Sequence, residues 1–262
     1  MFYFVKIGKI DERHFKLLKC CCKGWGKALT SIDFIRSEEK KYHEYCYDNY
    51  KLFEAGSWLY KPVKTVIDLL HVFDDKDNVK VLDLGCGVGR NSIPIAEAIK
   101  QKNGKIVCVD LLDSALQKLR EYSKEYMVEE VILTEKADIG NYEININEYD
   151  LIVAISSLEH VQSELMLDKA IQQMVNGTQN NGINCIIVNS EATEIDVVTN
   201  KRLDALMEIN LSTKDMMAKI SSFYKGWEVL KSEVKPLEYN ITRNGRTVLL
   251  KTNAISYVVR KK

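Results

Sequence analysis

The sequence predicts an α/β fold in which helices cover both faces of a doubly wound, mostly parallel sheet. From Val79 onward, short aliphatic and β-branched runs alternate with amphipathic stretches, which is the pattern of strands alternating with helices. Glycines at positions 85, 87 and 89 form a turn between the first strand and the helix that follows it. The last part of the chain carries strand-like segments with no helix between them. We therefore expect antiparallel strands at one side of the sheet.

The N-terminal region differs in composition from this alternating part. Helices are expected at residues 11–23, 37–53 and 63–72, and the second of these is polar and rich in tyrosine. The aromatic residues either pack between a helical cap and the core or form a lid over a ligand, with Trp58 and Tyr60 nearest to it. We therefore predict a cap or lid over residues 1–60 and a ligand-binding domain over residues 61–262.

The elements of the larger domain follow in order. Val79, Val81 and Leu82 belong to the first strand, and Asn91 or Ser92 is expected to cap the helix after the glycine turn. The N-terminus of that helix would face a ligand. Further strands are expected at residues 105–110, 131–134, 149–155 and 183–188, and helices at residues 114–126 and 164–175.

The C-terminal part is less regular. Residues 190–211 are expected to cover the substrate at the carboxyl edge of the sheet, and a helix is expected at residues 213–224. Short terminal strands are expected at residues 228–230, 237–241, 248–251 and 254–259, with Asn244 and Gly245 forming a hairpin turn.

The composition limits the possible functions. Basic and acidic residues both number 37 among 262, so the chain has no overall field that attracts nucleic acid, although a local basic patch is possible. No apolar run approaches the roughly 18 residues of a membrane-spanning helix, and the N-terminus lacks the features of a signal peptide. The sequence therefore predicts a cytoplasmic protein that does not enter a membrane.

The cysteines and histidines do not indicate a metal site. Seven cysteines, an odd number in a chain without a signal, predict reduced thiols. Cys20, Cys21 and Cys22 are adjacent and lack the spacing and the second ligand pair of a zinc site. The four histidines are scattered along the chain, so no metal is predicted.

The glycine turn distinguishes two classes of ligand. The dinucleotide fingerprint is G-x-G-x-x-G, but Arg90 stands where its third glycine would be. The pattern is instead G-x-G-x-G preceded by Asp83, and it resembles motif I of the class I S-adenosylmethionine-dependent methyltransferases. Residues 82–92 and 223–229 resemble the tellurite-resistance-type branch of that family. The resemblance implies a Rossmann-like sheet of seven strands with an antiparallel last strand, and S-adenosyl-L-methionine as the cofactor of residues 61–262.

The predicted cofactor site lies at the carboxyl ends of the strands, where open α/β sheets bind their ligands. Asp110 ends the second strand 21 residues after Gly89, so it is the candidate for binding the ribose hydroxyls. The resemblance implies that the glycine turn and Asp83 lie at the amino acid part of the cofactor. It also implies that Leu111 packs on adenine, that Asp138 accepts the adenine amino group, and that the backbone at residues 155 and 156 faces the methionine part. The predicted cofactor-binding residues are Asp83, Gly85, Cys86, Gly87, Gly89, Asn91, Asp110, Leu111, Ala137, Asp138, Ile139, Ile155, Ser156, Trp58 and Tyr60.

The catalytic residue is not identified by the sequence. Methyl transfer is an in-line displacement that an enzyme promotes mainly by alignment, so a general base is optional. Glu159 and His160 follow the fourth strand and are the candidates, with His160 a weak candidate for the proton acceptor. The alternative is that residues 156–160 only shape the wall of the site.

The absence of two motifs narrows the range of methyl acceptors. No [D/N]-P-P-[Y/F/W] sequence follows the fourth strand, and no proline precedes a cysteine, so methylation of nucleic-acid bases by those two routes is not expected. We predict a small-molecule acceptor, while protein methylation stays open. The branch resemblance suggests a soft nucleophile such as a chalcogen oxyanion. A non-enzymatic S-adenosylmethionine sensor and a nicotinamide-dependent oxidoreductase are the alternatives, and no oligomeric state is predicted.

Overall fold

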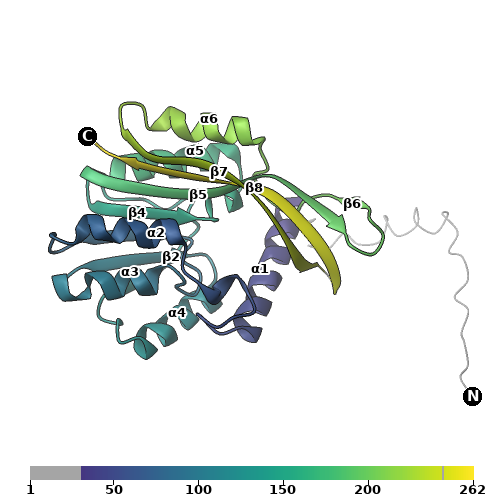
Figure 1. Ribbon diagram of the computed structural model, residues 1–262, viewed down its shortest axis with the longest axis horizontal. Coiled ribbons are helices and arrows are strands. Elements are labelled where there is room, and N and C mark those ends of the chain that lie inside the picture. Colours follow the sequence, from purple (N-terminus) through teal and green to yellow (C-terminus); the bar gives the residue numbers. More distant parts are fainter. Residues whose placement is uncertain (1–30, 244) are drawn as a thin grey trace, which may run out of the picture.

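The computed structural model describes residues 31–243 and 245–262, and a single sheet runs through its centre (Figure 1). The helix predicted at residues 11–23 and the three adjacent cysteines lie outside the described residues. The strands are β1 Lys80–Leu84, β2 Lys105–Asp110, β3 Ile132–Lys136, β4 Tyr149–Ile155, β5 Thr178–Asp196, β6 Arg202–Leu203, β7 Glu228–Arg243 and β8 Arg246–Arg260.

The strand order confirms the predicted fold class. Along the sheet it is β3-β2-β1-β4-β5-β8-β7, with β6 paired to β5. The strands β1 to β5 are parallel, whereas β8 runs antiparallel to both of its neighbours, β5 and β7. The sheet is therefore doubly wound and mostly parallel, and its last strand in the chain is reversed.

Helices lie on both faces of this sheet (Figure 1). They are α1 Ser31–Asn49, α2 Lys64–Leu69, α3 Ser92–Ile99, α4 Asp113–Glu125, α5 Glu164–Gly177 and α6 Thr213–Phe223, with 3-10 turns η2 Trp58–Tyr60, η3 Leu70–Phe73, η4 Lys100–Lys102 and η5 Leu158–His160. Buried residues of α3 and α4 belong to one apolar cluster, and those of α5 and α6 belong to another. The apolar faces that the sequence predicts are therefore buried against the sheet.

The C-terminal strands are longer than the sequence predicts. Where four short segments were expected, β7 and β8 are continuous strands of 16 and 15 residues, paired as far as Arg243 and Arg246. The strand β5 also continues to Asp196, so residues 190–211 are only partly irregular. Most of β7 is exposed, and its polar residues hide the strand pattern. The far ends of β5, β7 and β8 form an arm that extends beyond the helices, and α1 lies beside its base (Figure 1).

The helix α1 begins and ends earlier than the predicted 37–53. The chain leaves the helix after Asn49, the amide of Leu52 donates to Tyr122 Oη at 3.1 Å, and Phe53 has a left-handed φ of 65°. The tertiary contact with α4 therefore decides where the helix ends. Within the described ranges, no helix combines the length and the apolar character that crossing a membrane requires.

Candidate active site at the carboxyl edge of the sheet

The glycine turn packs closely against the protein itself. The amides of Gly85 and Cys86 donate to the carbonyl of Val109 at 2.8 and 3.0 Å, which fixes the turn to the end of β2. Gly85 has a φ of 78°, and a Cβ there would lie 2.3 Å from Ser157 Cβ. Gly89 has a φ of 95°, and its Cβ would lie 2.4 Å from a Leu119 methyl. Both positions therefore require glycine for packing as well as for backbone conformation.

Asp110 joins the second strand to this turn. Its Oδ2 accepts the amide of Gly87 at 2.8 Å, and its Oδ1 accepts the amide of Leu112 at 2.9 Å. Burial raises the pKa of Asp110, and these two amides oppose that rise. Each carboxylate oxygen keeps a further lone pair, because an ionised carboxylate has about four acceptor sites. This arrangement fits the predicted binding of two ribose hydroxyls.

Asp83 and Asn91 flank the turn in the sequence, and the side chain of each bonds another part of the chain. Asp83 is buried, and its Oδ2 accepts the hydroxyl of Ser92 at 2.6 Å. Burial raises the pKa of Asp83 to about 7, although the Ser92 hydrogen bond lowers it. Asn91 occupies the N-cap position of α3 but makes no capping bond with its side chain; its Oδ1 instead accepts the amide of Val63 at 2.9 Å. Asn91 is therefore the N-cap residue as predicted, although its side chain makes no capping hydrogen bond.

The residues predicted to surround adenine are brought to the same edge, and α1 reaches them. The Oδ2 of Asp138 accepts Arg36 Nη1 at 2.9 Å, and its Oδ1 accepts the amide of Gly140 at 3.0 Å. Ala137 and Ile139 beside it are half-buried, and Leu111 is exposed. The acceptor predicted for the adenine amino group is thus already paired with a cation of α1.

At the end of β4, the two residues predicted for the methionine part differ in exposure. Ile155 is buried, whereas Ser156 is exposed and has a left-handed φ of 51°. The Nδ2 of Asn189, on the neighbouring strand β5, donates to Ser156 Oγ at 3.4 Å.

Aromatic residues of α1 cover the glycine turn. A Cβ on Gly87 would meet the hydroxyl of Tyr47 at 3.2 Å. The Trp58 ring lies edge-on to His43 and Tyr47, with centroids 5.7 and 6.2 Å apart. The Arg90 guanidinium stacks 5.1 Å above the Trp58 ring and donates to the Trp58 carbonyl at 3.0 Å. Trp58 is therefore held beside the turn and also packs against the apolar core, so its position fits both the packing and the lid alternatives.

Tyr60 lies differently from Trp58. Its side chain is exposed, and the ammonium of Lys61 stacks 4.8 Å above its ring. Tyr60 makes no described contact with the other predicted cofactor residues, so its role there stays a prediction.

His160 is held in an ion pair. Its Nδ1 lies 2.9 Å from Glu208 Oε2, and Arg36 Nη2 donates to the His160 carbonyl at 3.1 Å. Burial lowers the pKa of His160. The hydrogen bond to Glu208 and the charges of Glu39 and Glu159 outweigh this effect and raise the pKa from 6.5 to about 9. The imidazole is therefore cationic at neutral pH, which argues against its predicted role as a proton acceptor in this conformation.

The His160–Glu208 pair predicts a specific pH dependence of stability. Because the pKa of His160 is raised from 6.5 to about 9, its contribution is complete below pH 6.5 and is lost as the pH rises through 9. We expect wild type to lose about 2 kcal/mol more unfolding free energy than Glu208→Gln over this range, allowing for partial exposure of the imidazole. Urea unfolding of both proteins at the two ends of the range measures the difference. Equal pH dependence in both would contradict the assignment.

Five charged residues that the sequence did not single out lie around the site. Arg243 Nη2 donates to Glu39 Oε1 at 2.7 Å and to Glu194 Oε1 at 3.1 Å, which joins the β7–β8 arm to α1 and β5. Arg36 Nε lies 3.6 Å from Glu208 Oε1. One signal was available in the sequence, because positions 36, 39, 43 and 47 share one face of α1 and are all polar or aromatic.

Unsatisfied polar atoms gather in this region. Within residues 31–243 and 245–262, the buried side-chain nitrogen and oxygen atoms without a hydrogen-bond partner are Arg36 Nε, Arg90 Nε, Glu159 Oε2, Asn189 Oδ1, Arg243 Nε and Arg243 Nη1. All of them belong to the turn, the loop after β4, the end of β5 or the elements that cover them. Because buried polar groups are normally paired, this concentration indicates a place where a ligand supplies partners.

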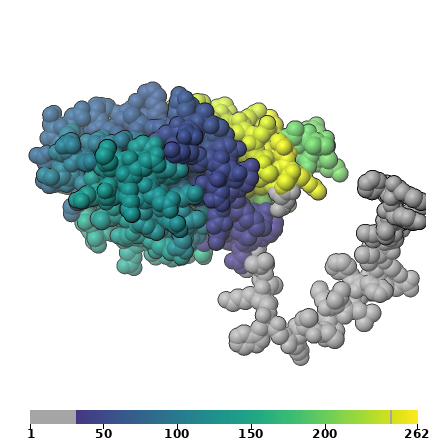
Figure 2. Space-filling view, turned by 90° about the horizontal axis from the view of Figure 1, so that it is seen from below, coloured from purple at the N-terminus to yellow at the C-terminus, as the bar shows by residue number. Residues whose placement is uncertain are grey.

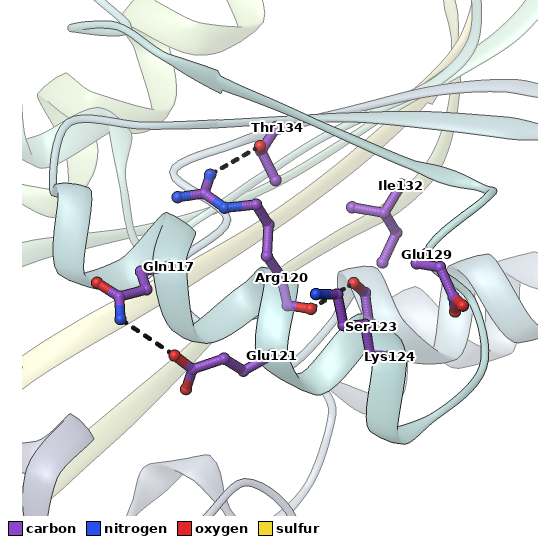
Figure 3. Close-up of a pocket in the computed structure, with 8 residues that line it drawn as sticks. All are labelled: Gln117, Arg120, Glu121, Ser123, Lys124, Glu129, Ile132 and Thr134. Atoms are coloured by element: carbon purple, nitrogen blue, oxygen red, sulfur yellow. Dashed lines mark hydrogen bonds between the residues drawn. The ribbon is translucent and has the colours of Figure 1, made fainter.

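Two cavities lie away from this site. One of about 400 Å³ opens between α4 and β3, where Arg120 Nη1 bonds Thr134 Oγ1 at 3.0 Å (Figure 3). Another of about 540 Å³ lies around Lys76 and Asp150 at the opposite edge of the sheet. Neither is lined by a predicted cofactor residue, so we do not assign them to the reaction.

Metal and thiol chemistry have no identifiable centre in the described part of the chain. No group of three or more potential metal-binding side chains occurs there. Cys46, Cys86, Cys108 and Cys185 are free and buried, and the last two lie in β2 and β5 as predicted.

Comparison with known proteins agrees with this geometry. The profile of the family described as "Methyltransferase domain" matches residues 81–182. The tRNA N(3)-methylcytidine methyltransferase trm140 of Schizosaccharomyces pombe is 26% identical over 114 residues, which are 42% of this chain and 36% of that protein. The sterol 24-C-methyltransferase of Debaryomyces hansenii is 27% identical over 92 residues, 35% of this chain and 24% of that protein. The chain thus spans about a third or less of the curated relatives that it matches.

A solved structure shows the same fold. The structure of TehB from Haemophilus influenzae superimposes with a TM-score of 0.56 and 21% identity, covering 84% of this chain and 67% of that one. The chain therefore has the fold expected from the sequence, a mostly parallel, doubly wound sheet whose last strand is reversed. Residues 81–182 are similar in sequence to a methyltransferase domain, the type of domain that the glycine turn predicts.

Proposed function

We propose that the chain transfers the methyl group of S-adenosylmethionine to a small-molecule acceptor by in-line displacement. The observation that carries this proposal is the bond between Gly87 N and Asp110 Oδ2, which joins the glycine turn to the second strand in one binding edge. S-adenosylmethionine supplies a methyl group on a positively charged sulfur, which is a good leaving group. The residues of the chain then need chiefly to bind and align the two partners.

The predicted cofactor residues take the following proposed roles. Asp110 binds the ribose hydroxyls with the lone pairs that Gly87 and Leu112 leave free. The turn residues pass beneath the amino acid part, with Asp83 acting from behind the turn and partly through water. Ile155 and Ser156 face the methionine part from the end of β4.

We further propose that the cap predicted over residues 1–60 acts as a lid, and its described part, residues 31–60, includes α1 and the 3-10 turn η2. Figure 2 shows α1 as the dark band against the body of the domain, beside the yellow end of β8. Arg36 bonds Asp138 at 2.9 Å, and Tyr47 lies against the glycine turn. The lid must therefore move, or share these contacts, when the cofactor enters.

A small acceptor is supported by the balance of charge and by the enclosure of the site. Arg243 ties the β7–β8 arm to α1, and Glu208 ties the segment after β6 to His160. A nucleic acid would require an open and basic surface, whereas the chain has a net charge of zero. The relatives carry names that refer to tRNA and to sterols, so they do not define one class of acceptor.

Calorimetric titration with S-adenosylmethionine, S-adenosylhomocysteine and NADH tests the cofactor part of the proposal. We expect the first two to bind and NADH not to bind. Binding of NADH alone would overturn the proposal and favour an oxidoreductase.

Transfer of a tritiated methyl group tests the acceptor part. The protein is incubated with labelled S-adenosylmethionine and, separately, the small-molecule, RNA and protein fractions of a cell extract. We expect label in the small-molecule fraction. Label in RNA or protein would contradict the acceptor class, and cofactor binding without transfer to any fraction would favour a sensor.

A further inference from the structure

Glu159 is a buried carboxylate in which one oxygen accepts hydrogen bonds and the other has no hydrogen-bond partner. Its side chain is fully buried in η5, directly after β4. The Oε1 atom accepts both the amide of Asn189 at 3.0 Å and its Nδ2 at 2.6 Å, whereas Oε2 has no hydrogen-bond partner. A structural link between η5 and β5 explains Oε1 but not Oε2. Leaving a buried charged oxygen unpaired costs stability, so Oε2 is suited to a donor that a ligand brings.

Asn189 presents a second unused acceptor next to the first. Its Nδ2 donates to Glu159, and its Oδ1 is buried without a partner. The same Nδ2 lies 3.4 Å from Ser156 Oγ, at the strand end proposed to face the methionine part. Two adjacent acceptors without donors favour a ligand atom that carries hydrogen and disfavour a bare anion.

The surroundings of Glu159 place it at the covered side of the site. Burial raises its pKa, while the His160 charge and the Asn189 hydrogen bonds lower it. Its carbonyl accepts the amide of Ile209 at 3.0 Å, from the segment between β6 and α6. Glu159 therefore lies between the strand end proposed to face the methionine part and the segment that was predicted to cover the substrate.

We propose that Glu159 binds the N–H or O–H of the acceptor's nucleophilic atom and receives its proton, with Asn189 positioning that atom. The acceptor is then an amine or a hydroxyl compound, and not a soft oxyanion. This assignment rests on the proposed methyl transfer. The acceptor lone pair forms a bond to the methyl carbon while the carbon–sulfur bond breaks and leaves its electron pair on sulfur. The acceptor proton passes to Oε2.

Analogues of S-adenosylhomocysteine test the proposal without knowledge of the natural acceptor. In these probes nitrogen replaces sulfur and carries a two- or three-carbon arm ending in an amine, a hydroxyl, a methyl or a carboxylate. Binding of each probe is measured by calorimetry to wild type, Glu159→Gln and Asp150→Asn. Asp150 is a matched control because it is also a buried carboxylate, but it bonds Lys80 N at 2.9 Å at the opposite edge of the sheet.

We expect wild type to bind the probe with an amine or hydroxyl arm at least about 10-fold more tightly than the probe with the methyl-ended arm. One hydrogen bond to a carboxylate accounts for a difference in affinity of this size. That preference is lost in Glu159→Gln and kept in Asp150→Asn, while S-adenosylhomocysteine binds all three alike. A preference for the amine or for the hydroxyl arm tells which acceptor class applies.

Three results would overturn the proposal. The first is that wild type binds the amine, hydroxyl and methyl arms equally well. The second is that Glu159→Gln keeps the preference of wild type, and the third is that wild type binds the carboxylate arm most tightly. The first and third require only wild type, so they hold even if the variant does not fold. Failure of S-adenosylhomocysteine itself to bind would instead refute the proposed function, and this inference with it.

Discussion

Asp110→Ala is expected to weaken the binding of S-adenosylhomocysteine by about 100-fold or more. The substitution removes the acceptors proposed for two ribose hydroxyls, and each hydrogen bond to a charged group contributes about 1.5–3 kcal/mol. It also releases the amide of Gly87, which Asp110 Oδ2 holds at 2.8 Å, so the turn loses one of its links to β2 and keeps those to the Val109 carbonyl. Calorimetric titration measures the effect, and thermal unfolding shows whether the fold is retained.

Asp113→Ala is the matched control. Asp113 lies three residues further on and is also an aspartate, but its side chain is 77% exposed and pairs with Lys136. We expect binding within about twofold of wild type, because exposed ion pairs contribute little. Asp110→Asn keeps the shape and one acceptor oxygen, and it should lie between the two. Unchanged affinity in Asp110→Ala would remove this residue from the cofactor site.

The buried parallel strands are the part of the fold that the sequence predicts best. The predicted ranges 105–110 and 149–155 coincide with β2 and β4. Such strands are covered on both faces, so they form continuous apolar runs bounded by turn residues. The strand β7 is mostly exposed and includes Pro236, and only its pairing with β8 makes it one strand. Pairing between distant segments leaves little periodic signal in a sequence.

The candidate site, like the fold, has one part that the local sequence predicts and another that depends on contacts between distant residues. The placement of Asp110 beside the turn was predictable because it depends on local spacing along a strand, a turn and a helix. Arg36 and Asp138 are 102 positions apart, and His160 and Glu208 are 48 apart. The fold determines which residues form such ion pairs, because it brings distant segments together. A charged residue on a helix face has many possible partners in the sequence. The sequence therefore predicted His160 without the carboxylate that keeps it protonated.

Gly85→Ala is expected to lower the unfolding free energy by about 2–5 kcal/mol. The new Cβ would lie 2.3 Å from Ser157 Cβ, and Ser157 is itself held by a 2.7 Å bond from its hydroxyl to the Leu84 carbonyl. Left-handed strain contributes about 1–2 kcal/mol, and overpacking contributes about 1–3 kcal/mol more. Thermal unfolding should show a fall in Tm of roughly 10 °C.

Gly226→Ala separates the two contributions to this loss. Gly226 also has a positive φ, 86°, but a Cβ there would meet nothing within 4 Å. It therefore carries the backbone strain without the collision, and we expect a loss of only about 1–2 kcal/mol. The difference between the two variants then measures how tightly the turn packs against the loop after β4. Equal losses of unfolding free energy would mean that Ser157 moves aside at no cost. Only the backbone conformation would then require a glycine at position 85.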